Sequence, residues 1–195
     1  MFLKNLEKYT ITLASESPRR HDLLHKAGIP FSIGQGRHIP ETIPDNTNID
    51  DVALFLARLK ADAWKDIWEK TGQLVITADT IVAIDNQILG KPEGPEHATE
   101  MLKKLSGHSH RVITGVVART SDKEVAFSDI TTVHFKPLNI EQIHFYIEND
   151  QPFDKAGAYG IQEWIGVTGI ERIEGCYFNV MGLPVPRLTD ELKIF

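Results

Sequence analysis

The segment that most constrains the fold is the apolar run from Leu74 to Ile84, L-V-I-T-A-D-T-I-V-A-I. A strand with one face in water alternates polar and apolar residues, whereas this run is apolar at almost every position. We therefore expect a strand at the centre of a sheet. Helical and strand patterns alternate along the rest of the chain, so the sequence predicts an α/β fold with a mixed sheet and flanking helices.

Asp79, in the middle of this run, is the most conspicuous single residue of the chain. A buried carboxylate costs free energy unless it is paired, hydrogen-bonded or bound to a metal. One interpretation is structural, with Lys91 in the following Gly-Lys-Pro loop as the partner. The other is functional, because an isolated acid in an apolar strand often marks a site.

A strand followed directly by a helix is predicted near the start of the chain. Tyr9–Leu13 is β-branched and apolar, which is typical of a buried strand. Ser17 is a good N-cap, Pro18 suits the first helical position, and Gly28 is placed to end the helix. The chain therefore turns from strand to helix within a few residues.

This strand-to-helix turn has the composition of an anion site. Ser15 and Ser17 supply hydroxyls beside the exposed N–H groups of a helix N-terminus, and Arg19 and Arg20 lie in the first turn. Arginine is unfavourable there for the helix itself, because the helix dipole prefers anions at that end. A bound phosphate would remove the conflict. The alternative is a pair of surface arginines balanced by Asp22 and solvent.

The remaining elements place two more candidate residues. Glu41 lies in a polar, proline-containing loop, and Lys60 lies at the edge of the apolar stripe of a long helix. We expect strands at 31–36, 110–119 and 124–135, helices at 49–71, 95–105, 140–148 and 188–194, a loop at 37–48, and tight passages at 154–162 and 175–184.

Composition narrows the class of protein. The 195 residues, of which 42% are hydrophobic, suit one domain, 1–195, with room for two lobes on one sheet. A net charge of -6 argues against nucleic acid as the main partner. The single cysteine, Cys176, fits a reducing cytoplasm, Lys4, Glu7 and Lys8 interrupt any signal-peptide pattern, and no stretch is apolar enough to cross a membrane.

Taken together, these residues predict a site for phosphates. It combines a cationic helix N-terminus with the carboxylates of Asp79 and Glu41 and the amines of Lys60 and Lys91. A carboxylate pair with cations nearby suits Mg²⁺ or Mn²⁺ bound together with phosphate groups.

Seven short motifs connect these residues through a family resemblance. In order along the chain, they are L-A-S-E-S-P-R-R-H-D-L-L (13–24), L-A-R-L-K-A (56–61), A-D-T-I-V (78–82), I-L-G-K-P (88–92), M-L-K-K-L-S-G (101–107), D-K-A-G-A-Y-G-I-Q (154–162) and N-V-M-G-L-P (179–184). The ordered set resembles the Maf family of nucleoside triphosphate pyrophosphatases. The resemblance implies a fold similar to that of inosine triphosphate pyrophosphatase, an elongated mixed sheet with flanking helices and a central cleft between two lobes.

The resemblance also implies roles for individual residues. Its phosphate-binding positions fall on Ser15, Ser17, Arg19 and Arg20, and its catalytic positions on Asp79, Lys60, Lys91 and Glu41. Asp79 and Glu41 would hold a divalent metal, Mg²⁺ or Mn²⁺, with Co²⁺ as a further candidate. The loop H-I-P-E-T around Glu41 is less acidic than the family pattern.

The implied reaction is hydrolysis between the α- and β-phosphates, which gives a nucleoside monophosphate and pyrophosphate. Arg19, Thr80 and Gln162 match the branch that uses dTTP and UTP, together with modified uridine triphosphates. Two alternatives stay open: a 7-methyl-GTP pyrophosphatase, and a nucleotide-sensing regulator of septum formation in cell division. The resemblance further implies a homodimer with no nucleic-acid or membrane partner.

Overall fold

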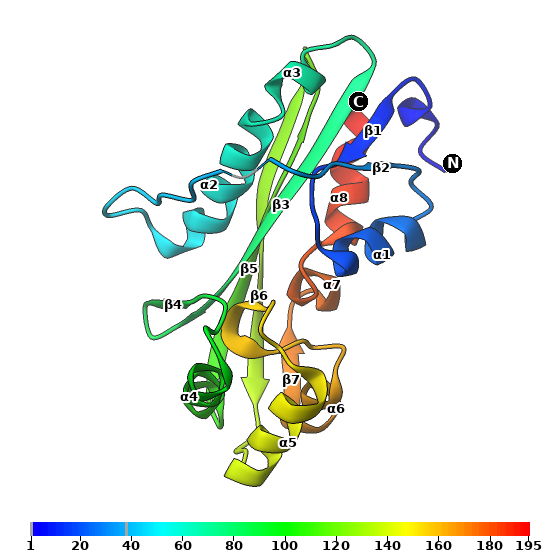
Figure 1. The fold of residues 1–195 in the computed structure, drawn as a ribbon. Helices are drawn as coiled ribbons and strands as arrows, with labels where there is room; N and C mark the ends of the chain where they lie inside the picture. The colour runs from blue at the N-terminus through cyan, green and yellow to red at the C-terminus, as the bar shows by residue number, and fades with distance from the viewer. Residues whose placement is uncertain (1, 38) are drawn as a thin grey trace. The chain divides into compact units, whose positions relative to one another are not determined.

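The computed structural model describes residues 2–37 and 39–195. Within them, seven strands form one mixed sheet in the order β2-β1-β3-β5-β6-β7, with β4 paired to β3 off this path (Figure 1). The β1 strand pairs in parallel with β2 and β3, whereas β3–β4 and β6–β7 are antiparallel. The strands are β1 Thr10–Leu13, β2 Ser32–Ile33, β3 Gln73–Ile84, β4 Gln87–Leu89, β5 Ser109–Arg119, β6 Glu124–Phe135 and β7 Ile170–Glu174.

Helices flank this sheet, which confirms the predicted α/β class. The α-helices are α1 Pro18–Lys26, α2 Ile49–Asp62, α3 Lys65–Trp68, α4 Pro95–Leu105, α5 Ile140–Asp150, α6 Trp164–Gly169, α7 Tyr177–Val180 and α8 Val185–Glu191. Short 3₁₀ helices cover Lys4–Leu6, Ala156–Ala158 and Leu192–Ile194. In the described part of the chain, no helix is long and apolar enough to cross a bilayer.

The chain forms two compact units. The first contains the residues up to Asp79, together with Thr114–Asp129 and Gly182–Phe195, and the second contains Thr80–Ile113 and Ile130–Met181. The boundary passes through β3 between Asp79 and Thr80. Asp79 is therefore the last residue of the first unit before the chain enters the second unit.

In the first unit, small residues bring α2 into direct contact with the sheet (Figure 1). A Cβ atom added at Gly115 of β5 would lie 2.4 Å from the carbonyl oxygen of Ala53, so a larger residue would push the helix away. The hydroxyl of Thr77 on β3 also donates to the carbonyl of Ala57, at 2.7 Å. These contacts fix the face of α2 that carries Lys60 against β3.

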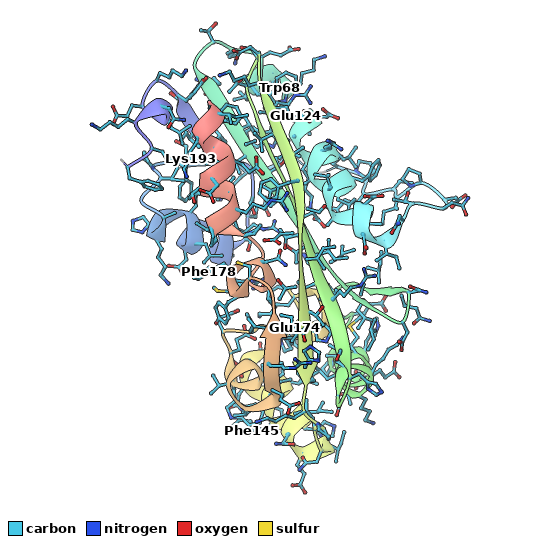
Figure 2. All side chains as sticks on the ribbon, turned by 180° about the vertical axis from the view of Figure 1, so that it is seen from behind. Trp68, Glu124, Phe145, Glu174, Phe178 and Lys193 are labelled. Atoms are coloured by element: carbon cyan, nitrogen blue, oxygen red, sulfur yellow. The ribbon has the colours of Figure 1, made fainter. Side chains whose placement is uncertain are left out.

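The predicted helix 49–71 is wrong in one respect, because it breaks into α2 and α3 around Trp64. The indole of Trp68 donates to the carbonyl of Ala61 at 2.9 Å, and the guanidinium of Arg37 donates to that of Ala63. Side chains thus satisfy carbonyl groups that a continuing helix would have used. Arg119 stacks 4.0 Å from the Trp68 ring, near the end of the unit where Figure 2 labels Trp68 and Glu124.

In the second unit, α4 and α5 pack over a core that contains Phe135, Tyr146 and Tyr159. The α5 helix begins with a capping box, in which Asn139 and Gln142 exchange hydrogen bonds of 2.8 and 2.9 Å. The α6 helix and the β7 strand were not predicted, and the predicted strand 31–36 is reduced to β2. Figure 2 labels Glu174 at the end of β7 and Phe145 on α5.

Candidate active site

The loop from β1 to α1 is held by short hydrogen bonds. The N–H of Ala14 donates to the carbonyl of Ile76 at 2.8 Å, and Nε2 of His21 lies 2.6 Å from the carbonyl oxygen of Ser15. Ser17 is the N-cap residue of α1, as predicted, but its hydroxyl makes no capping bond within the described residues. Instead, Ser15 Oγ accepts from the N–H of Ser17 at 3.3 Å.

Arg20 braces this loop against β3. Its Nε donates to the carbonyl of Gly182 at 2.8 Å, and its Nη1 donates to the carbonyl of Ala78 at 2.8 Å and to Ser15 Oγ at 3.4 Å. Burial lowers the pKa of Arg20, while the nearby carboxylate of Asp79 raises it. The guanidinium therefore binds the carbonyl group of Ala78, the residue before Asp79. There it positions the β1–α1 loop and adds positive charge.

Lys60 joins the two predicted acidic residues. Its ammonium group contacts Oδ1 of Asp79 and lies 2.9 Å from Oε1 of Glu41. The side chain of Asp79 is only 13% exposed, and this pairing offsets part of the cost of its burial. Lys60 therefore partners Asp79 within the first unit, because α2 lies against β3 and delivers the lysine to that carboxylate. The pairing of Asp79 with Lys91 stays a prediction.

Arg37 anchors the loop that carries Glu41, and sequence reasoning missed it. Its guanidinium stacks 4.2 Å from the Trp64 ring, and its Nη2 donates to Oδ2 of Asp66 at 3.0 Å. The hydrogen bond from Arg37 lowers the pKa of Asp66. The signal in the sequence is weak, because one arginine in a polar loop does not reveal which tryptophan it will meet.

The other predicted residues belong to the second unit. Thr80 is half-buried on β3, Lys91 is exposed in the loop before α4, and Gln162 is exposed before α6. The carbonyl of Gly90 accepts from the N–H of Gly157 at 3.0 Å, which ties the lysine loop to the turn at 154–162. The first unit thus brings together five predicted residues: Ser15, Arg20, Glu41, Lys60 and Asp79.

Comparison with known proteins identifies the family. The model of the family described as Maf-like protein matches residues 10–195. The chain belongs to the Maf family. Three curated Maf relatives are each named dTTP/UTP pyrophosphatase. A Phocaeicola vulgatus protein is 49% identical, with 98% of each chain covered, and a Bacteroides thetaiotaomicron protein is 46% identical, again with 98% of each covered. A Cytophaga hutchinsonii protein is 48% identical over 99% of this chain and 87% of its own.

The carboxylates of this Maf chain fit a divalent cation. Asp79 and Glu41 already share one cation, the ammonium of Lys60, so their oxygens converge on a single point. Mg²⁺ is usually bound through one or two carboxylates, with substrate phosphates and water completing the coordination. Among the described residues, no group of three or more histidine, cysteine or acidic side chains could hold a metal. Two carboxylates of this kind would suit a metal that is bound together with phosphate.

Proposed function

We propose that this Maf protein hydrolyses dTTP and UTP to the monophosphate and pyrophosphate. The observation that carries the proposal is the pair of carboxylates, Asp79 and Glu41, bound to Lys60 beside the loop that Arg20 braces. Relatives that are 46 to 49% identical over nearly the whole chain carry the name of this activity. Phosphoryl chemistry needs such a mixture of acids and cations, because the triphosphate is strongly anionic.

The chemical step assigns distinct tasks to these groups. Water attacks the α-phosphorus, the bond to the oxygen that bridges to the β-phosphate breaks, and pyrophosphate leaves. Asp79 accepts the proton of the attacking water. Lys60 holds the Asp79 and Glu41 carboxylates together. When bound by those two carboxylates, Mg²⁺, Mn²⁺ or Co²⁺ supplies positive charge for the phosphate oxygens.

The β1–α1 loop binds phosphate in this proposal. Ser15, Ser17 and Arg19 stand at the N-terminus of α1, where backbone N–H groups and the helix dipole favour an anion. Arg20 acts as a brace for these groups, because two of its hydrogen bonds go to backbone carbonyls. Lys91, in the second unit, remains a predicted cation for the same substrate.

The pyrimidine preference depends on Arg19, Thr80 and Gln162, the three positions that match the dTTP and UTP branch. A threonine hydroxyl and a glutamine amide each offer a donor and an acceptor, which suits the polar edge of uracil or thymine. One methyl group changes binding by only about 1–3 kcal/mol, so 5-substituted uridine triphosphates should also be used. We also propose that the protein acts in the cytoplasm, which holds the triphosphates, and that it forms a homodimer.

A pyrophosphate-release screen tests it. Purified protein is given dTTP, UTP, CTP, GTP and 7-methyl-GTP with Mg²⁺, Mn²⁺ or Co²⁺, and Asp79→Asn serves as the inactive control. We expect the highest kcat/KM for dTTP and UTP. Preference for 7-methyl-GTP would refute the pyrimidine assignment alone. Nucleotide binding with no turnover under any metal would refute the enzyme and favour a nucleotide sensor. Light scattering after size exclusion gives the oligomeric state.

A further inference from the structure

We propose that Glu163 is a positioning residue that fixes the direction of the Gln162 side-chain amide, and thereby sets the preference for uracil and thymine over cytosine. The inference rests on the proposed function and adds to it the residue behind the discrimination between pyrimidine bases. Its evidence lies wholly within the second unit, in the turn between the 3₁₀ helix Ala156–Ala158 and α6.

The carboxylate of Glu163 is surrounded by hydrogen-bond donors. Lys155 Nζ lies 3.0 Å from its Oε1, and the hydroxyl of Tyr146 donates to its Oε2. Both side chains of the ion pair are largely buried, at 10% exposure for Lys155 and 16% for Glu163. Burial raises the pKa of Tyr146, so its hydroxyl keeps the proton that it donates. These two partners hold the carboxylate in place.

Gln162 donates to this fixed carboxylate. Its Nε2 lies 3.2 Å from Oε1 of Glu163. A carboxylate only accepts hydrogen bonds, so the amide must present its NH₂ group to Glu163 and direct its carbonyl oxygen elsewhere. An exposed glutamine normally samples both directions of its amide, whereas this one is restricted to a single order of donor and acceptor.

Gly160 provides the space for this arrangement. A Cβ atom added there would lie 2.8 Å from Nε2 of Gln162 and 2.6 Å from Cδ of Glu163, so both side chains lie over the glycine. The N–H of Gly160 also donates to the Tyr146 hydroxyl at 3.0 Å. The backbone at Gly160 and the carboxylate of Glu163 therefore both restrict the rotation of the Gln162 amide.

A fixed amide distinguishes the pyrimidines because their polar edges are reversed. Uracil and thymine present the O4 acceptor beside the N3–H donor, whereas cytosine presents an amino donor beside the N3 acceptor. An amide with one order of donor and acceptor can make two hydrogen bonds to only one of these edges. An amide that turns freely can pair with either. Glu163 therefore acts on the choice of base without touching it.

Three variants separate positioning from stability, with kcat/KM for UTP divided by that for CTP as the readout. Glu163→Ala removes the acceptor, and Gly160→Ala displaces both side chains without changing any charge. For each, we expect the UTP/CTP ratio to fall about tenfold, the value of one hydrogen bond. Glu163→Gln should keep the ratio. The ammonium group of Lys155 can only donate hydrogen bonds, so the new amide should place its oxygen toward Lys155, where it still accepts from Gln162.

The controls make every outcome informative. Glu171→Gln changes the same charge at an exposed position of β7 and should leave the ratio unaltered. A lower Tm for Glu163→Gln with an unchanged ratio would support positioning, because the ion pair is then lost while the discrimination stays. If Glu163→Ala does not fold, Gly160→Ala provides the test. An unchanged ratio in Glu163→Ala or in Gly160→Ala, whichever of the two folds, would overturn the inference.

Failure of the proposed function is visible separately. Wild-type protein that hydrolyses neither dTTP nor UTP would overturn that function, and this inference with it, before any variant is made. Wild-type protein that uses UTP and CTP equally well would overturn the inference alone, since it would have no discrimination for Glu163 to produce.

Discussion

His110 should make the protein lose stability as the pH falls, and the structure gives the size of the loss. The residue lies on β5 with 2% of its surface exposed, and its Nε2 is 2.7 Å from the hydroxyl of Tyr159. Its Nδ1 is buried and has no hydrogen-bond partner among the described residues. A second proton on the ring would therefore create a buried donor without an acceptor. Burial, and then repulsion from His134, lowers the pKa of His110 to about 3.

The sign and the magnitude follow from this pKa. The unfolded chain binds a proton at His110 near the ordinary value of 6.5, whereas the folded chain does not until about 3. Acid therefore favours the unfolded state throughout that interval, and the loss grows by about 1.4 kcal/mol for each pH unit. Between about pH 7.5 and pH 5, His110 alone should remove about 2 kcal/mol of the free energy of unfolding.

Urea unfolding at these two pH values tests the prediction. His110→Gln cannot titrate, so its free energy of unfolding should fall by about 2 kcal/mol less than that of the wild type over the same interval. His144→Gln, at an exposed position of α5, is the matched control and should follow the wild type. If the free energy of unfolding depends on pH equally in the wild type and in His110→Gln, His110 binds its proton as readily in the folded chain as in the unfolded chain. That result would refute the reasoning.

Substitutions at four further positions test the first unit. Asp79→Asn should lower kcat on the order of 100-fold or more while the protein still folds; near-normal turnover would remove Asp79 from the chemistry. Arg20→Ala should lower kcat/KM and cost about 1–3 kcal/mol of stability, because two carbonyl groups lose their donor; Arg20→Lys should not restore the Tm, and full restoration would mean that only charge matters. In calorimetry without nucleotide, Lys60→Met should bind Mn²⁺ more tightly than the wild type, since no ammonium group competes with the metal for the two carboxylates; weaker binding would argue against a metal there. Gly115→Ala should cost about 1–3 kcal/mol, and a neutral effect would mean that α2 yields easily.

Local patterns were enough to predict several elements of the fold. The bounds of α4 agree with the predicted 95–105, and β6 agrees with 124–135. Both carry strong periodicity between clear breaks, so neighbouring residues alone determine them. The break between α2 and α3 is different, because its carbonyl groups are satisfied by Arg37 and Trp68. Of these two donors, Arg37 lies in a separate loop, and no local pattern contains that contact.

The residues of the candidate site likewise divide into those that a local pattern reveals and those that depend on tertiary contacts. Asp79 could be found from the sequence because a carboxylate in an apolar strand is conspicuous wherever the strand lies. Its contact with Lys60 could not, because that contact depends on the packing of α2 against Gly115. Glu163 was missed for a related reason. Its ion pair with Lys155 depends on the path of the turn between the two residues, which no local pattern contains.

The position of Lys60 links the stability of the first unit to its proposed chemistry. The carboxylates of Asp79 and Glu41 converge on one point and repel one another, and the ammonium of Lys60 offsets this repulsion. In the proposed function, a triphosphate and its metal would add negative and positive charge at the same place, so the lysine could transfer its hydrogen bonds from carboxylate to phosphate while the metal pairs with the acids. The residue that pairs the two carboxylates is thus also suited to neutralise a bound phosphate, and the close packing of α2 on the sheet, permitted by Gly115, makes both roles available to a single side chain.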